Sequence, residues 1–169
     1  MFVTFSELPK TARVWIYQAS RIMDDAEQNS LQNELQLFIA NWTAHQAGLK
    51  GSAEIRLGIF VIIAVDEGHN HASGCSIDKS VHFMKQFGDR TGINFFDRMT
   101  AVCQNPDGEL VFVNTRNVNE LLVSGKLSKE AMLFNNLINH VHDLDADWRK
   151  PLSASWLSNF IQSQITSNS

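Results

Sequence analysis

The chain has little cysteine and little proline, and its apolar runs are short. Cys75 and Cys103 are its two cysteines, and three prolines occur in 169 residues. Two cysteines make no disulfide framework and fit a reducing compartment. The longest apolar run, Ile59 to Val65, is far too short to span a bilayer, and the stretch Met1 to Glu7 lacks the pattern of a secretion signal. These absences predict a cytoplasmic protein with no membrane partner.

Positive charge is also scarce. Lys and Arg number 14 against 18 Asp and Glu, the formal net charge is −4, and no run of Lys or Arg occurs. Nucleic acids and anionic membranes attract concentrated positive charge, so the sequence predicts neither as a partner. A chain of this length that is 44% hydrophobic can bury a full core. Because no repeat or linker interrupts it, residues 1–169 are expected to form a single domain.

Hydrophobic periodicity and turn residues predict mixed α and β structure. Apolar residues spaced by three and four indicate helices, and runs of β-branched and aromatic residues indicate strands. The segment Asn105 to Gly108 supplies the Pro and Gly of a hairpin turn. The expected strands are 13–19, 53–57, 59–65, 98–104 and 109–114, and the expected helices are 25–44, 76–87, 128–142 and one that begins near 155.

The expected order is β-α-β-β-α-β-β-α-α, which predicts a two-layer α+β fold. Its first six elements match the ferredoxin-like β-α-β-β-α-β core, with an added hairpin strand and two C-terminal helices. We expect the first and third strands of this core to be adjacent and parallel. Their ends would then gather Gln18, Ser20 and Arg21 with Asp66 and Glu67 on one rim, beside both helix N-termini.

The segment from Val65 to Asp78 is the candidate site. An apolar strand ends there in carboxylates, histidines and a thiol, which open an amphipathic helix, and functional groups gather at such strand-to-helix loops. Cys75, near the helix N-terminus, is the candidate nucleophile because the helix dipole favours thiolate over thiol. Asp66 and Glu67 are the candidate acids or bases, or polar anchors for a ligand, and Cys75 could alternatively serve as a redox centre.

Polar groups near this segment and two arginines could bind a ligand. An arginine clamps carboxylate or phosphate groups. The alternatives are structural: carboxylates oppose a nearby thiolate, small cysteines are often buried, and Asp97 beside Arg98 makes an ordinary ion pair. The candidate binding residues are Arg21, Ser73, Ser76, Asp78 and Arg98.

His69 and His71 carry the side-chain type that binds metals. With the thiol and carboxylates around them they offer the ligand types that zinc prefers. Their spacing matches no common zinc signature, and the alternative is a pair of solvated loop histidines. A second His-x-His pair, His140 and His142, falls in an expected helix, and convergence of the two pairs would strengthen the case. No cofactor is predicted.

Phosphate-binding motifs are absent from the sequence. Gly125 and Lys126 match the second Gly and the Lys of a P-loop. However, Glu120 replaces the first Gly of that motif, and Leu127 replaces the Ser or Thr that binds magnesium. Neither a Gly-x-Gly-x-x-Gly fingerprint nor a Gly-x-Ser-x-Gly elbow occurs. The chain is therefore predicted not to be a P-loop ATPase.

A family resemblance rests on short segments spread over nearly the whole chain. They are 14–19, Trp42 with His45, 65–67, 73–78, 94–98 and 148–156. In these segments the chain resembles a small bacterial family often labelled "ABC transporter ATPase". The resemblance implies a bacterial protein and directs attention to Ser73–Asp78. The label itself implies a Walker A loop, a signature motif and a Walker B Asp, none of which the sequence contains.

Two functional hypotheses follow from the sequence and stay open at this point. The first is a small-molecule or thiol-chemistry site around Cys75. The second is a non-catalytic binding or protein-interaction module, with an exposed apolar patch on the C-terminal helices as its contact surface. A concave pocket favours the first, and a sizeable exposed apolar face favours the second.

Overall fold

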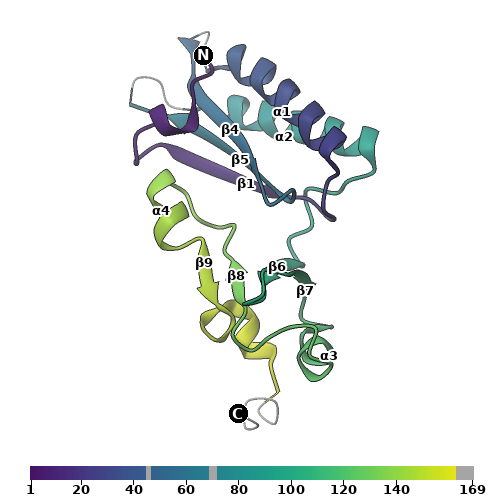
Figure 1. Cartoon of the computed structure of the whole chain (residues 1–169). Coiled ribbons are helices and arrows are strands. Elements are labelled where there is room, and N and C mark those ends of the chain that lie inside the picture. Colours follow the sequence, from purple (N-terminus) through teal and green to yellow (C-terminus); the bar gives the residue numbers. More distant parts are fainter. Residues whose placement is uncertain (45–46, 69–71, 163–169) are drawn as a thin grey trace. The chain divides into compact units, whose positions relative to one another are not determined.

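A computed structural model describes residues 1–44, 47–68 and 72–162 (Figure 1). Contacts between Cα atoms divide the chain into two compact units: the first contains Met1–Asp97 with Asn136–Leu144, and the second contains Arg98–Asn135 and the chain from Asp145 onward. In chain order the elements, with η for a 3₁₀ helix, are η1 (Phe5–Glu7), β1 (Arg13–Gln18), α1 (Asp25–Ala40), β2 (Thr43–Ala44), β3 (Ala47–Gly48), β4 (Lys50–Arg56), β5 (Phe60–Asp66), α2 (Gly74–Thr91), β6 (Ala101–Gln104), β7 (Leu110–Val113), α3 (Val118–Val123), β8 (Met132–Phe134), α4 (Val141–Ala146), β9 (Arg149–Pro151), η2 (Leu152–Ala154) and η3 (Trp156–Phe160).

The first unit is built on a three-stranded antiparallel sheet in the order β1-β5-β4. β5 pairs with β4 along its whole length, and with β1 from Arg13 opposite Val65 to Gln18 opposite Phe60. β1 and β4 therefore run in the same direction with β5 between them, which is a split βαβ connection through α1. Sheets and helices together confirm the predicted α+β class.

The predicted parallel pairing of the first and third strands is wrong. β4 turns directly into β5 at Leu57 and Gly58, which both have positive φ, so β5 runs opposite to β4. Since α1 returns the chain to make β4 parallel to β1, β5 is antiparallel to both strands. The Gln18 end of β1 and the Asp66 end of β5 consequently lie at opposite ends of the sheet. The predicted rim does not form.

The outer edge of β1 is covered by a segment from much later in the chain. The N–H of Val14 donates to the carbonyl of Asn139 at 2.8 Å, and the N–H of Val141 donates to the carbonyl of Ala12 at 2.9 Å. A fourth ferredoxin-like strand would occupy this edge. The strand expected for that place instead pairs with β7 and β8 as β6 of the second unit.

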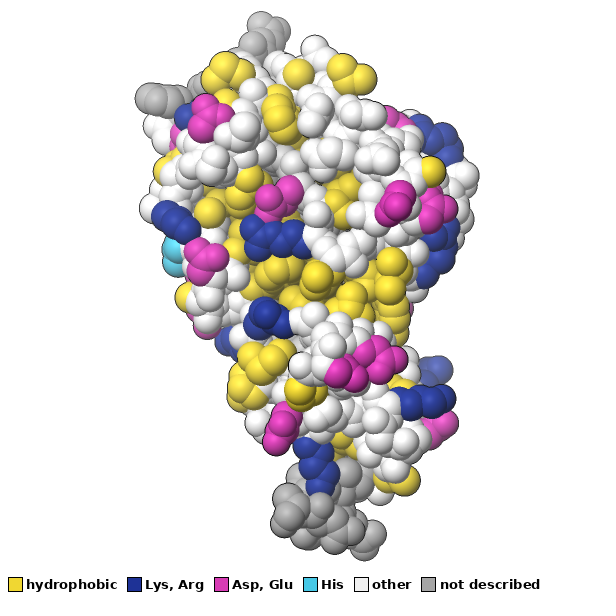
Figure 2. Space-filling view, viewed as in Figure 1, with side chains coloured by type: hydrophobic (Ala, Val, Ile, Leu, Met, Phe, Trp, Pro, Cys, Tyr) yellow, Lys and Arg dark blue, Asp and Glu magenta, His cyan; other side chains and the backbone are white. Residues whose placement is uncertain are grey.

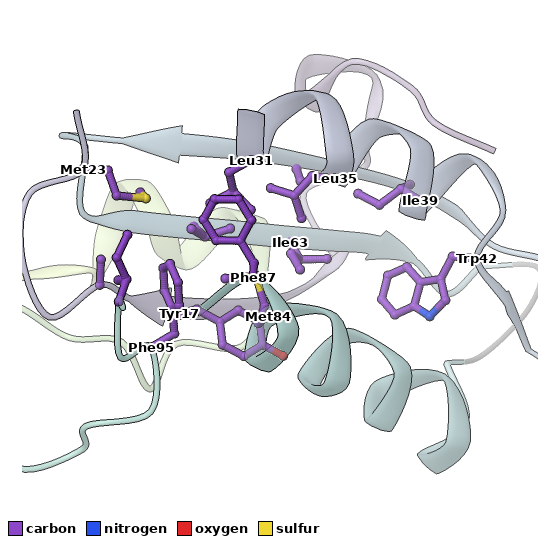
Figure 3. Close-up of a cluster of buried hydrophobic side chains, with 14 of the residues drawn as sticks. Tyr17, Met23, Leu31, Leu35, Ile39, Trp42, Ile63, Met84, Phe87 and Phe95 are labelled. Carbon is purple, nitrogen blue, oxygen red and sulfur yellow. The ribbon is translucent and has the colours of Figure 1, made fainter. Parts of the chain in front are cut away.

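Both main helices cover one face of this sheet and close the core of the first unit (Figure 1). Leu31, Leu35 and Ile39 from α1 and Met84 and Phe87 from α2 lie between the helices and the strands (Figure 3). β5 is buried on both faces, as its uninterrupted apolar run predicts. Among the described residues, no helix combines the length and apolar character needed to cross a membrane.

The face of α2 that meets the core is rotated slightly from the one that its apolar spacing predicts, which carries Ile77, Val81, Met84 and Phe87. Met84 and Phe87 are buried as predicted. Ile77 is half-buried and Val81 is 38% exposed, while Ser76 and Ser80 are buried. The hydroxyl of Ser80 lies 2.7 Å from the carbonyl of Ile77 and 3.1 Å from the hydroxyl of Tyr17. Because these partners satisfy the polar atoms, the core accepts the serines without the cost of an unpaired group.

The second unit contains a four-stranded antiparallel sheet in the order β7-β6-β8-β9. β6 and β7 form the predicted hairpin, and Gly108, with φ of +94°, closes its turn. Cys103, Leu133 and Leu157 belong to the buried core of this unit.

Two predicted helices of the C-terminal part are wrong. Within the stretch 128–142, Met132–Phe134 form strand β8, which pairs with β6 and β9, and the last two residues belong to α4. Leu137, expected on the apolar face of that helix, is 83% exposed. The edge of β6 supplies backbone hydrogen-bonding partners from a distant part of the sequence. This pairing outweighs the local helical spacing of apolar residues. The last predicted helix, expected to begin near 155, is instead the short 3₁₀ helix η3, which follows η2.

We expect Leu35→Ala to lower the free energy of unfolding by about 2–5 kcal/mol, because Leu35 is fully buried and its loss leaves a cavity. Leu37→Ala is the matched control on the same helix. Leu37 is 67% exposed, so its truncation should change the same quantity by less than about 0.5 kcal/mol. Urea denaturation followed by circular dichroism measures both. Equal losses for the two variants would contradict the packing of α1.

Candidate functional site

Helix α2 begins with a well-formed cap that accounts for two predicted binding residues. Ser73 is the N-cap, and its hydroxyl accepts a hydrogen bond from the N–H of Ser76 at 3.2 Å. The hydroxyl of Ser76 donates to the carbonyl of Ser73 at 2.8 Å. This exchange satisfies backbone groups at the helix end. Both serines position the start of α2, and Cys75 lies exposed between them.

Trp42 ties the start of α2 to the end of α1. Its buried indole N–H donates to the carbonyl of Ser76 at 2.9 Å. Its ring packs against Phe38, with centroids 5.3 Å apart, and meets Trp15 edge-on at 6.2 Å. The helix that carries Cys75 is therefore fixed to the core by one buried hydrogen bond and by aromatic contacts.

A groove lies beside this junction, between the end of α1 and the part of α2 from Cys75 to Gln86. Its volume is about 540 Å³. Phe38 of α1 and Phe83 of α2 stack in it with ring centroids 4.9 Å apart and planes inclined by 24°. The spacing of the α2 residues places them along one face of the helix. The lining residues are Phe38, Cys75, Asp78, Lys79, His82, Phe83 and Gln86.

The carboxylates predicted to serve Cys75 are engaged in the loop that precedes α2. Asp66 accepts a hydrogen bond from the N–H of Gly68 at 3.0 Å and lies 3.9 Å from the ammonium of Lys50. Glu67 accepts from the N–H of Ala72 at 2.9 Å. Among the described residues that line the groove, neither carboxylate is present. Their contacts support a structural role for both.

Arg21 lies at the other end of β1 from the Asp66 loop. Its guanidinium forms two hydrogen bonds to the carboxylate of Glu27, at 2.6 and 2.8 Å. Glu27 also accepts from the N–H of Asp24, whose side chain caps α1 in return. The bond from Arg21, with the backbone bond from Asp24, lowers the pKa of Glu27 to about 2. Arg21 thus completes the cap of α1.

The structure does not place the remaining candidate residues, Arg98, His69 and His71, beside Cys75. Arg98 belongs to the second unit, whereas Cys75 and Asp78 belong to the first. His69 and His71 lie outside the described residues. The structure therefore brings Cys75 and Asp78 together in the groove, and it adds Phe38, Lys79, His82, Phe83 and Gln86, which sequence reasoning missed. The spacing of 75, 78, 79, 82, 83 and 86 on one helix was the available signal.

Glu27→Gln should destabilise the protein most above about pH 5 and progressively less as the pH falls toward 2. The folded pKa of about 2 lies below the ordinary value of 4.5. Such a carboxylate contributes stability that is present above 4.5 and lost as the pH falls toward 2. Urea unfolding across this range measures the gap between variant and native protein. Arg21→Gln should remove much of the same pH dependence, and a gap that stays constant with pH would refute the assignment.

Iodoacetamide should alkylate Cys75 in the native protein and leave Cys103 unmodified. Cys75 is exposed, whereas burial raises the pKa of the Cys103 thiol to about 12 and shields the sulfur. Peptide mass spectrometry after a timed reaction distinguishes the two sites, and both should react in denaturant.

Cys75→Ser is the companion variant. It should abolish native alkylation and change the free energy of unfolding by less than about 0.5 kcal/mol, as expected of an exposed position. A loss above about 2 kcal/mol would mean that Cys75 belongs to the core.

Comparison with known proteins adds no assignment to this geometry. No family model, no curated protein and no solved structure matches the chain. The resemblance to the bacterial family stays a prediction, and the site is interpreted from its own chemistry.

Proposed function

We propose that the protein binds a small aromatic molecule in the groove between α1 and α2, with the thiol of Cys75 at the rim of the site. The observation that carries this function is the groove itself. Its volume of about 540 Å³ falls within the range of small-molecule sites, roughly 300–1,000 Å³. A thiol and two stacked phenyl rings share that space.

The lining favours a ligand with a flat apolar ring. Phe38 and Phe83 are both partly buried, so their rings form the apolar part of the groove and leave surface for a third ring. Aromatic rings stack offset or meet edge-to-face, and each such contact contributes about 0.5–1.5 kcal/mol beyond burial. Phe38 packs in turn against Trp42, which is itself held by its hydrogen bond to Ser76.

The polar residues of the groove favour a ligand that also carries hydrogen-bonding substituents. Lys79 supplies a donor, and the Asp78 carboxylate supplies an acceptor next to it. Gln86 and His82, farther along the same helix face, can donate or accept. Opposite charges side by side suit a neutral or zwitterionic ligand better than a polyanion. The lining therefore supports a small ligand that combines an aromatic ring with hydrogen-bonding groups.

The same proposal includes a cytoplasmic bacterial protein that does not act on nucleic acids. Its two cysteines are free thiols, which suits a reducing compartment. Lys and Arg are interspersed with Asp and Glu on the face shown in Figure 2, whereas nucleic-acid surfaces concentrate positive charge. These features support the proposal without naming a ligand.

Disulfide exchange at Cys75 tests the groove directly. Two disulfide reagents of matched leaving group, one that attaches a benzyl group and one that attaches a hydroxyethyl group, compete for the native protein. Stacking on Phe38 and Phe83 should favour the benzyl adduct by about 2–10-fold over the ratio found in denatured protein. Phe83→Ala should return the ratio toward the denatured value.

Val81→Ala is the matched control, because Val81 is exposed on the same helix and does not line the groove. It should leave the benzyl preference unchanged. Circular dichroism confirms that both variants are folded. Equal ratios in native and denatured protein, or a preference that survives Phe83→Ala, would sink the proposal.

One observation favours the alternative function, a non-catalytic interaction module. Trp156 and Phe160 on η3 are 42% and 49% exposed and pack edge-to-face with centroids 6.3 Å apart. Exposed aromatic pairs are typical of contact surfaces. The exchange experiment separates the two functions, since a module that works through η3 requires no aromatic preference at Cys75.

A further inference from the structure

Three side chains that commonly bind metals gather around the start of α4, in the first unit. They are His140, His142 and Asp143, and one potential ligand atom from each lies within 4.8 Å of the others. Nε2 of His142 is 3.1 Å from Oδ1 of Asp143, and Nδ1 of His140 is 3.7 Å from Oδ2 of Asp143. The two imidazole rings stack with centroids 5.4 Å apart. None of these residues lines the groove between α1 and α2.

We propose that His140, His142 and Asp143 bind a divalent transition-metal ion of the zinc type. Two imidazole nitrogens and one carboxylate oxygen are ligands that zinc and its neighbours accept. Tetrahedral ligands about 2.0–2.1 Å from a zinc ion lie roughly 3.3 Å from one another. The 3.1 Å between Nε2 of His142 and Oδ1 of Asp143 is close to that separation, and one ligand atom from each of the three residues lies within 4.8 Å of the others. Three protein ligands leave a fourth position for water.

The surroundings of His142 orient its ring for this role. Nδ1 of His142 lies 3.1 Å from the carbonyl oxygen of Lys10. A carbonyl only accepts, so this contact places a hydrogen on Nδ1. Nε2 faces the carboxylate of Asp143, and a metal ion that binds Nε2 would replace any hydrogen there. Metal-binding histidines typically donate their second ring N–H to a carbonyl or carboxylate in this way.

The carboxylate of Asp143 is also held in place. Its Oδ2 accepts hydrogen bonds from the N–H groups of Asn139, at 3.3 Å, and His140, at 3.1 Å. Its Oδ1 faces His142. The carboxylate thus has one oxygen held by the backbone, while the other faces His142 and is placed to bind a metal.

The backbone that carries these ligands is anchored to β1. His140 forms an antiparallel bridge with Arg13, and the N–H of His142 donates to the carbonyl of Lys10 at 3.0 Å. The three proposed ligands thus belong to a backbone segment that hydrogen bonds to β1 and the residues before it hold in place. Sites on such supported backbone need little reordering to bind an ion.

Titration of the chelator-treated full chain with Co²⁺ tests the proposal. Co²⁺ substitutes for zinc and reports nitrogen and oxygen coordination by its visible absorption. We expect one equivalent to bind with a visible band, and His140→Ala and His142→Ala each to weaken binding at least about 10-fold. Both histidines are about half exposed, at 48% and 54%, so these variants should fold. Asp143→Asn should also weaken binding, while its amide oxygen can still accept hydrogen bonds from the N–H groups of Asn139 and His140.

His82→Ala is the matched control, since His82 is an exposed histidine of the same unit on α2. It should leave Co²⁺ binding unchanged. Zn²⁺ at about 100 times its dissociation constant should also raise the melting temperature by roughly 5–10 °C, and His142→Ala should abolish that rise. Absence of saturable Co²⁺ binding would mean that the two histidines and Asp143 only interact with one another and bind no metal. Binding that survives both histidine variants would place the metal elsewhere, and either result would overturn the proposal.

Discussion

Burial of β5 between two partner strands is the constraint on which the rest of the first unit depends. Its apolar run fills both faces of the sheet, and β1 and β4 take up the hydrogen-bonding groups along its two edges. With β5 in the centre, β1 becomes an outer strand whose free edge needs a partner. Residues 139–142 provide it. The grouping of His140, His142 and Asp143 beside β1 is a consequence of that pairing.

The groove follows from the way α2 meets the same core. Two serines face inward on α2, where Tyr17 and backbone carbonyls satisfy them. With this rotation Phe83 lies at the boundary between core and solvent, against Phe38 of α1. The hydrogen bond from Trp42 to Ser76 joins the residues that follow α1 to the start of α2. Because two serines occupy core positions on α2, part of the apolar surface of the helix lies at its side.

The local elements of the first unit could be predicted from sequence, because each is specified by nearby residues. Asp24 and Glu27 mark the start of α1, and the run Ile59 to Val65 marks a central strand. Strand direction could not be predicted so directly, because it depends on how β4 and β5 connect. The prediction for 128–142 is wrong for a different reason. Its apolar residues do have helical spacing, but Met132–Phe134 pair as a strand with β6 and β9 instead of forming a helix. In the site, Cys75 and Asp78 were identifiable from helix position, whereas Phe38 joins them only through tertiary packing.

The same strand that organises the first unit also carries a hazard. Seven successive apolar residues without proline or charge, several of them β-branched, have the composition of segments that stack into cross-β fibrils. In the folded protein β1 and β4 occupy both of its edges, so it presents no template to another chain. The hairpin with β4 forms from neighbouring residues, whereas β1 must return across α1 to close the other edge. Any condition under which β1 separates from β5 while the helices remain in place exposes this edge of β5 to other chains. The rate at which β1 pairs with β5 therefore governs how much of the protein stays soluble during folding.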